Sequence, residues 1–210
     1  VSAGGEVDAN IDYFITYTGT DDTLGNITVG DINLTVEDDA AVGFDAVFVA
    51  TGNSLGDLTI GDISVIGSSL SLNATADVLN FVVSASSAED MGDVTVGDIT
   101  VVLADQQNGN MAFIVNSITD DAGDMTVGDV SVTVGDDSSF ALTLVLTATG
   151  SAGDITVGDI TLNLGDEVTA GDVVVSAIAG DGDITLGDIA ISGTGYSDTS
   201  AFVLSALFNL

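Results

Sequence analysis

The sequence predicts an all-β protein, a parallel β-solenoid of about six coils, each of about 31 residues with three strands. Three observations predict this fold. A motif of eight residues recurs along the chain, apolar and small polar residues alternate with period two, and a glycine recurs at a fixed place within each motif.

The motif reads Gly-Asp/Asn-Φ-Thr-Φ-Gly-Asp-Φ, where Φ is an apolar residue. Its copies start at Gly25, Gly56, Gly92, Gly123, Gly153 and Gly182, so the successive spacings are 31, 36, 31, 30 and 29 residues. A period of this length is typical of one supersecondary unit that is stacked on its neighbours.

Each repeat divides into three apolar runs, represented by residues 154–157, 159–164 and 140–147. Val, Ile and Thr dominate and alternate with period two, which favours strands over helices. The alternation places Ile155 and Val157 on one face and Thr156 on the other. Aligned repeats would therefore stack their apolar residues into ladders.

A glycine separates the first run from the second in every repeat: Gly30, Gly61, Gly97, Gly128, Gly158 and Gly187. Such a glycine indicates a positive φ or a close backbone approach, and we expect the chain to bend there. The alternative fold is an antiparallel β-sandwich or barrel of hairpin repeats with Gly-Asp as a type II′ turn. Identical residues at identical places favour the solenoid, because ladders stack like on like.

The expected organisation has three parts. Residues 1–24 form an N-terminal strand segment, 25–192 the six-repeat domain, and 193–210 a C-terminal strand. The runs at 11–18 and 202–210 are candidate strands for contact between subunits. An uncapped β end is a template for another chain.

The composition of the chain limits the classes of function and the partners that we expect. The chain has 33 carboxylates and no Lys, Arg, His or Cys, which gives a formal net charge of −33. Nucleic acid and anionic membranes are therefore unsuitable partners. No run approaches the ~18 apolar residues of a membrane-spanning helix. The usual nucleophile and base pairs of enzymes cannot be assembled, so we expect no enzyme. The absence of sites for trypsin-like proteases favours an extracellular or cell-surface location.

The repeated acidic residues are the candidate metal ligands. If the coils stack in register, these residues form two columns, and successive carboxylates within each column lie about 5 Å apart. No basic side chain is present to offset their repulsion. Oxygen ligands of this kind select Ca²⁺, and the alternative is that each Asp caps its own turn. The candidate ligands are Asp57, Asp62, Asp93, Asp98, Asp124, Asp129, Asp154, Asp159, Asp183 and Asp188, and the first column starts with Asn26.

Two further patterns bear on partners. A Thr recurs at Thr28, Thr59, Thr95, Thr126, Thr156 and Thr185. The column resembles the Thr arrays of some β-solenoid ice-binding proteins, although the strand propensity of β-branched residues explains it better. Acceptor sequons at Asn26, Asn33 and Asn73 would permit attached N-glycans.

The phrases Gly-Asn-Ile-Thr-Val and Gly-Asp-Ile-Thr-Leu resemble the repeats of secreted prokaryotic β-helical adhesins of the filamentous-haemagglutinin type. This resemblance implies surface attachment or matrix building. We therefore expect an extracellular structural protein that assembles with copies of itself, head to tail, into a filament, sheath or surface layer. The alternative is a monomeric or anchored binding module, either an adhesin for glycans or an ice-binding protein.

Overall fold

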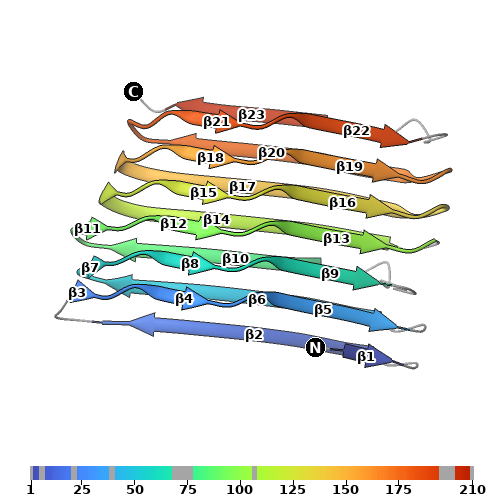
Figure 1. The fold of residues 1–210 in the computed structure, drawn as a ribbon, viewed down its shortest axis with the longest axis horizontal. Coiled ribbons are helices and arrows are strands. Elements are labelled where there is room, and N and C mark those ends of the chain that lie inside the picture. Colours follow the sequence, from blue (N-terminus) through green and yellow to red (C-terminus); the bar gives the residue numbers. More distant parts are fainter. Residues whose placement is uncertain are drawn as a thin grey trace.

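A computed structural model describes residues 2–4, 8–19, 23–37, 41–67, 78–105, 108–193 and 202–208. Within these residues the chain winds as a parallel β-solenoid, and every strand pair in its three sheets is parallel (Figure 1). The parallel pairing confirms the predicted solenoid and excludes the antiparallel hairpin alternative. The described residues contain no helix of the length and apolar character that a membrane span needs.

The front face of the solenoid, toward the viewer in Figure 1, consists of two sheets of short strands. The six-stranded sheet contains β4 (Ile27–Val29), β8 (Leu58–Ile60), β12 (Val94–Val96), β15 (Met125–Val127), β18 (Ile155–Val157) and β21 (Ile184–Leu186). The seven-stranded sheet contains β1 (Ser2–Gly4), β5 (Ile32–Glu37), β9 (Ile63–Gly67), β13 (Ile99–Leu103), β16 (Val130–Val134), β19 (Ile160–Leu164) and β22 (Ile189–Gly193).

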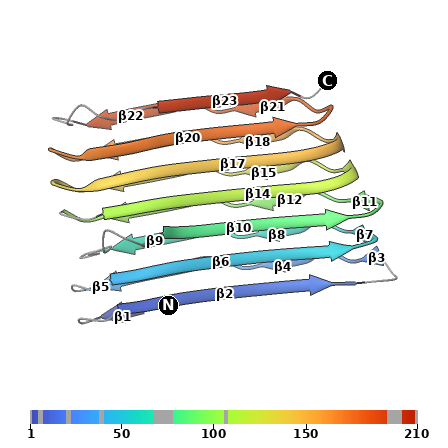
Figure 2. The same cartoon turned by 180° about the vertical axis from the view of Figure 1, so that it is seen from behind.

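Long strands form the back face, which Figure 2 shows. They are β2 (Asp8–Thr18), β6 (Ala41–Gly52), β10 (Val78–Ser87), β14 (Asn108–Ala122), β17 (Ser139–Ala152), β20 (Thr169–Ala179) and β23 (Phe202–Phe208). Three short corner strands join the same sheet: β3 (Thr23–Leu24), β7 (Ser54–Leu55) and β11 (Asp90–Met91). The two short strands of each coil run along the same side, so the solenoid is a flattened slab with two broad faces.

The core lies between the two faces, and the predicted alternation fills it. Ile155 and Val157 are buried while Thr156 between them is exposed. The long strands supply Leu144 and Leu146 from the opposite side. These residues form one continuous cluster, because identical positions in successive coils pair in register.

An aromatic row runs from the N-terminal end of this core inward. The ring centroids of Tyr13 and Phe48 are 5.7 Å apart, those of Phe48 and Phe81 5.4 Å, and those of Phe81 and Phe113 6.2 Å. Contacts of this kind add to the stabilisation from burial. The row starts at a half-exposed residue, since Tyr13 is 45% exposed.

The two segments proposed for contact between subunits are strands of the solenoid itself. β2 covers 8–18 and pairs with β6, while β23 covers 202–208 and pairs with β20. Each pairs along one edge among the described residues. The free edges of β2 and β23 therefore lie at opposite ends of the molecule (Figures 1 and 2).

Candidate functional site

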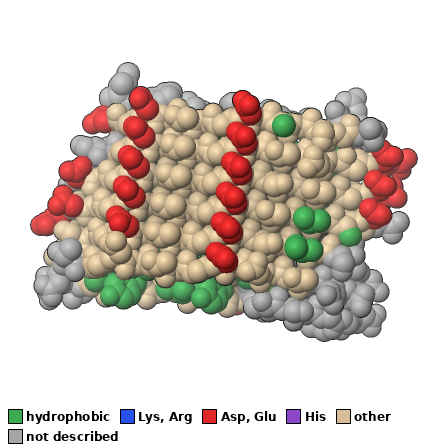
Figure 3. Space-filling model, in the orientation of Figure 1, with side chains coloured by type: hydrophobic (Ala, Val, Ile, Leu, Met, Phe, Trp, Pro, Cys, Tyr) green, Lys and Arg blue, Asp and Glu red, His purple; other side chains and the backbone are tan. Residues whose placement is uncertain are grey.

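Two columns of acidic residues cross the front face, each just before a short strand. The first column precedes the strands of the six-stranded sheet, and the second precedes those of the seven-stranded sheet. Figure 3 shows them as two red rows along the stacking direction. The structure therefore aligns the ten predicted Asp residues, five in each column.

One carboxylate oxygen of each inner Asp accepts a hydrogen bond from the next coil. The backbone N–H of Asp129 donates to Oδ1 of Asp98 (2.9 Å), and that of Asp159 donates to Oδ1 of Asp129 (2.8 Å). The same bond recurs in both columns, from Asn26 to Asp183 and from Asp31 to Asp188. One oxygen of each of these Asp residues thus links neighbouring coils, and turn capping by the other oxygen stays a prediction.

In the inner coils the glycine before the Asp is required by the same contact. A Cβ at Gly128 would lie 2.3 Å from Oδ1 of Asp98 and 2.9 Å from its backbone nitrogen. Because backbone atoms are among the neighbours, a side-chain rotation could not relieve the overlap. Gly-Asp is therefore one unit, in which the glycine leaves room for the carboxylate below and the aspartate binds the coil above.

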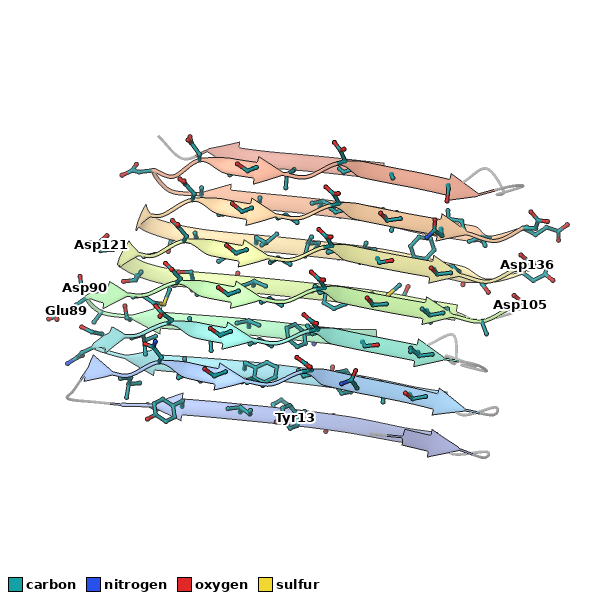
Figure 4. The ribbon with its side chains drawn as sticks, viewed as in Figure 1. Tyr13, Glu89, Asp90, Asp105, Asp121 and Asp136 are labelled. Carbon is teal, nitrogen blue, oxygen red and sulfur yellow. The ribbon has the colours of Figure 1, made fainter. Side chains whose placement is uncertain are left out.

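A third acidic column, which the sequence motif does not include, lies at the right-hand edge in Figure 4. The N–H of Asp136 donates to Oδ1 of Asp105 (2.9 Å), and the N–H of Asp166 donates to Oδ1 of Asp136 (2.7 Å). Gly135 and Gly165 precede these Asp residues and make the same close approach. Gly-Asp at a spacing of 30 residues was the signal that could have identified this column.

The chain turns into its long strand directly after this third column. Asp137 and Glu167 have positive φ values of 54° and 56° there. These are left-handed conformations, which are uncommon for residues other than glycine. The close approach at the glycine and the positive φ two residues later both recur in successive coils, so this corner has the same turn in each of them.

The calcium prediction receives no geometric support from the described residues, and it stays a prediction. No group of three or more acidic side chains lies close enough in that part of the chain to hold a metal ion. Each inner Asp uses one oxygen for the backbone of the next coil. Ca²⁺ takes six to eight oxygen ligands, so any bound ion would need several waters or a second molecule.

The Thr column is continuous on the six-stranded sheet. The structure places Thr28, Thr59, Thr95, Thr126, Thr156 and Thr185 opposite one another in register. Their side chains point outward and are exposed or half-buried. The column lies between the two acidic columns, so the front face alternates hydroxyl and carboxylate rows.

The sequons fall in three different settings. Nδ2 of Asn26 donates to Oδ2 of Asp57 (2.9 Å), so this side chain forms part of the first column. Asn33 is exposed on β5. Asn73 lies outside the described residues. A glycan on Asn33 would extend from the front face, and glycosylation stays a prediction.

No family model, curated protein or solved structure matches this chain. The resemblance to filamentous-haemagglutinin-like repeats therefore stays an expectation from sequence. What the structure does show is a tandem-repeat β-solenoid.

The arrangement suits stacking and surface display. It presents a flat acidic face, a buried apolar core, and two ends at which that core comes to the surface. At the C-terminal end Ile184, Leu186 and Ile189 are only partly buried, and Ile191 is 48% exposed. At the N-terminal end Tyr13 and Tyr17 are 45% and 48% exposed.

Proposed function

We propose that this protein is an extracellular structural protein whose copies stack head to tail through the ends of the solenoid. The observation that carries the proposal is that both ends combine unpaired strand edges with exposed core side chains. Among the described residues β2 pairs only with β6, and β23 pairs only with β20. Unpaired edges of this kind are templates for further strands.

Polarity supports the head-to-tail arrangement. Every strand pair within the molecule is parallel, so translating a second copy along the stacking direction brings its β2 beside β23 of the first with the same direction. The contact would continue the parallel ladder and cover apolar residues at both ends. A contact that repeats by translation does not close, and it produces filaments.

Charge opposes this contact. Each copy has a formal net charge of −33 and no basic side chain, so two copies repel until salt screens them. The Debye length falls from about 10 Å at 0.1 M to about 3 Å at 1 M ionic strength. Assembly should therefore increase with ionic strength.

Sedimentation velocity over a range of protein and salt concentrations tests the proposal. We expect particles that grow beyond the 20.9 kDa monomer as both are raised. The double variant Tyr13→Asp/Tyr17→Asp places charge on the N-terminal end and should remain monomeric. Ile118→Asp is the matched control, because Ile118 is 48% exposed on β14 in the middle of the back face. Particles of constant monomer mass at high salt would refute the proposal.

The second candidate is a binding module that uses the front face. The observation that favours it is the continuous Thr column between two acidic columns. This candidate predicts a monomer and a loss of binding when outward Thr residues are changed. Measurement of thermal hysteresis tests the ice-binding form, with Thr126→Val as the variant and Thr147→Val on the back face as its control.

A further inference from the structure

The back face of the solenoid carries an apolar column on its outer surface. Side chains of the long strands alternate between the core and the outside, so Val82 points outward between the buried Phe81 and Val83. Because these strands pair in register, outward apolar residues of five successive strands lie side by side. We call this column the apolar ladder, and it consists of Phe14, Val47, Val82, Ile114 and Val145.

The ladder crosses a part of the back face that carries no charge. Four consecutive long strands, β10, β14, β17 and β20, place residues 80–86, 112–118, 143–149 and 174–178 side by side. None of these positions is Asp or Glu, although the chain has 33 carboxylates. We call this area, in the middle rows of Figure 2, the neutral patch. Its outward side chains are Val, Ile and Ala together with Thr, Ser and Asn.

The two broad faces differ in how closely they let a second copy approach. The front face carries two columns of carboxylates (Figure 3), and the chain has no basic side chain that could pair with them in another copy. Two front faces would therefore repel each other. Between two neutral patches no carboxylates face one another. With about 10 Å between packed sheets, the acidic columns of the two copies would lie about 30 Å apart, beyond the Debye length of about 10 Å at 0.1 M ionic strength.

We propose that two copies of this chain pair back to back through their neutral patches. A two-fold axis along the apolar ladder places each ladder against its own copy, which is an isologous contact between identical surfaces. Val82, Ile114 and Val145 of both copies would then be buried in the contact. The product is a thicker slab with two acidic outer faces.

The size of the neutral patch determines the strength of this contact. Four strands at a spacing of about 4.8 Å and seven residues at about 3.3 Å give roughly 450 Å² per copy, or about 900 Å² for the pair. Stable interfaces bury about 1,200–2,000 Å², so a single pair is a weak contact that dissociates in dilute solution. Two stacked copies would double the area and bring it into that range. Only this extension to stacks rests on the proposed function.

Cross-linking detects a weak contact of this kind, because the chain has no cysteine of its own. Ile114→Cys places a thiol in the neutral patch, and Thr126→Cys places one on the front face as the control. Both are made in the Tyr13→Asp/Tyr17→Asp background, so that stacking through the ends does not contribute. The reagent is a short bismaleimide, since facing sheets lie about 10 Å apart and a disulfide needs Cα atoms within about 7 Å. We expect covalent dimers to form about tenfold faster from the Ile114→Cys chain.

A second substitution shows whether the patch itself makes the contact. Val82 and Ile114 pair in register, so Val82→Asp places a carboxylate beside the thiol of the Ile114→Cys chain. We expect this variant to cross-link as slowly as the front-face control. Val82→Thr adds no charge and should retain most of the rate. Because residue 82 points away from the core, both variants should melt together with the chain that carries Val82.

Electron microscopy at high salt tests the extension to stacks. We expect filaments two slabs thick from the unchanged chain. Ile118→Asp adds charge to the neutral patch and leaves the ends of the solenoid unchanged, so it should give filaments one slab thick. Filaments one slab thick from the unchanged chain would contradict the extension to stacks.

Two results would overturn the pairing: equal cross-linking rates at positions 114 and 126, or a rate that Val82→Asp leaves unchanged. Binding to neutral phosphatidylcholine vesicles without cross-linking would assign the patch to a lipid surface and would also overturn it. These outcomes are separate from the stacking proposal, which sedimentation decides. A chain that grows at high salt but cross-links equally at both positions stacks without pairing. A chain that never grows but cross-links rapidly at position 114 pairs without stacking.

Discussion

The first coil and the inner coils have the same motif in different surroundings. At Gly128 a Cβ would meet the Asp98 carboxylate and backbone of the coil below, whereas at Gly30 it would meet nothing within 4 Å. The motif therefore joins neighbouring coils, and its contacts form only where another coil lies beside it. The difference indicates that in the inner coils the glycine is needed for the close approach of the neighbouring coil.

The largest expected effect is on the glycines. Gly128→Ala forces a Cβ into backbone atoms and should lower the free energy of unfolding by about 3 kcal/mol. Gly30→Ala has open space and should change it by less than about 0.5 kcal/mol. Urea unfolding of both variants measures the contrast, and equal losses would show that the glycine serves the turn alone.

A substitution at a buried hydroxyl of the inner coils should raise the free energy of unfolding instead of lowering it. Ser117 is 1% exposed, and its Oγ has no hydrogen-bond partner among the described residues. Its neighbours in register are Ala85 and Ala148. Ser117→Ala removes an unpaired polar group and should raise the free energy of unfolding by about 1 kcal/mol. A destabilised variant in the same urea experiment would mean that the hydroxyl has a partner.

Substitutions of the aspartates distinguish the role of the carboxylate as a hydrogen-bond acceptor from the effect of its charge. Asp129→Asn keeps an oxygen for the N–H of Asp159 and removes one charge from the column, whereas Asp129→Ala removes both. We expect the Asn variant to be more stable than the Ala variant by about 1 kcal/mol. At Asp188 the side chain has no such N–H partner among the described residues, so its Asn and Ala variants should melt together. Thermal unfolding of the four variants tests this comparison.

Cations give the smallest expected effect. Salt should raise the melting temperature, because it screens repulsion within the columns. The calcium prediction requires millimolar calcium chloride to raise it more than sodium chloride of the same ionic strength, and to do so less in a chain with the column residues Asp98 and Asp129 changed to Asn. Equal effects of the two salts would contradict the calcium prediction and attribute the stabilisation to screening alone.

Much of the fold was predictable because its signal is local and repeated. The motif spacing and the alternation around Thr156 predicted strands, inward faces and stacked ladders, all of which the structure confirms. Other features depend on contacts between coils. The acceptor role of Asp98 toward Asp129, the third column at Asp136 and the flattened cross-section all belong to this class. The residues that make these contacts lie about 30 positions apart, so a pattern within one repeat does not show them, and only the Gly-Asp spacing hinted at the third column.

The sequence by itself favoured a parallel β-solenoid with aligned acidic and Thr columns over the antiparallel alternative, because like residues that recur about every 30 positions form ladders when they stack in register. Only the tertiary structure decided which contacts the residues of the columns make. Whether a carboxylate binds the next coil, and whether a glycine is crowded or open, depends on which strand lies beside it. At Gly25 and Gly30 none of the described strands lies beside the glycine, and a Cβ there would meet nothing within 4 Å.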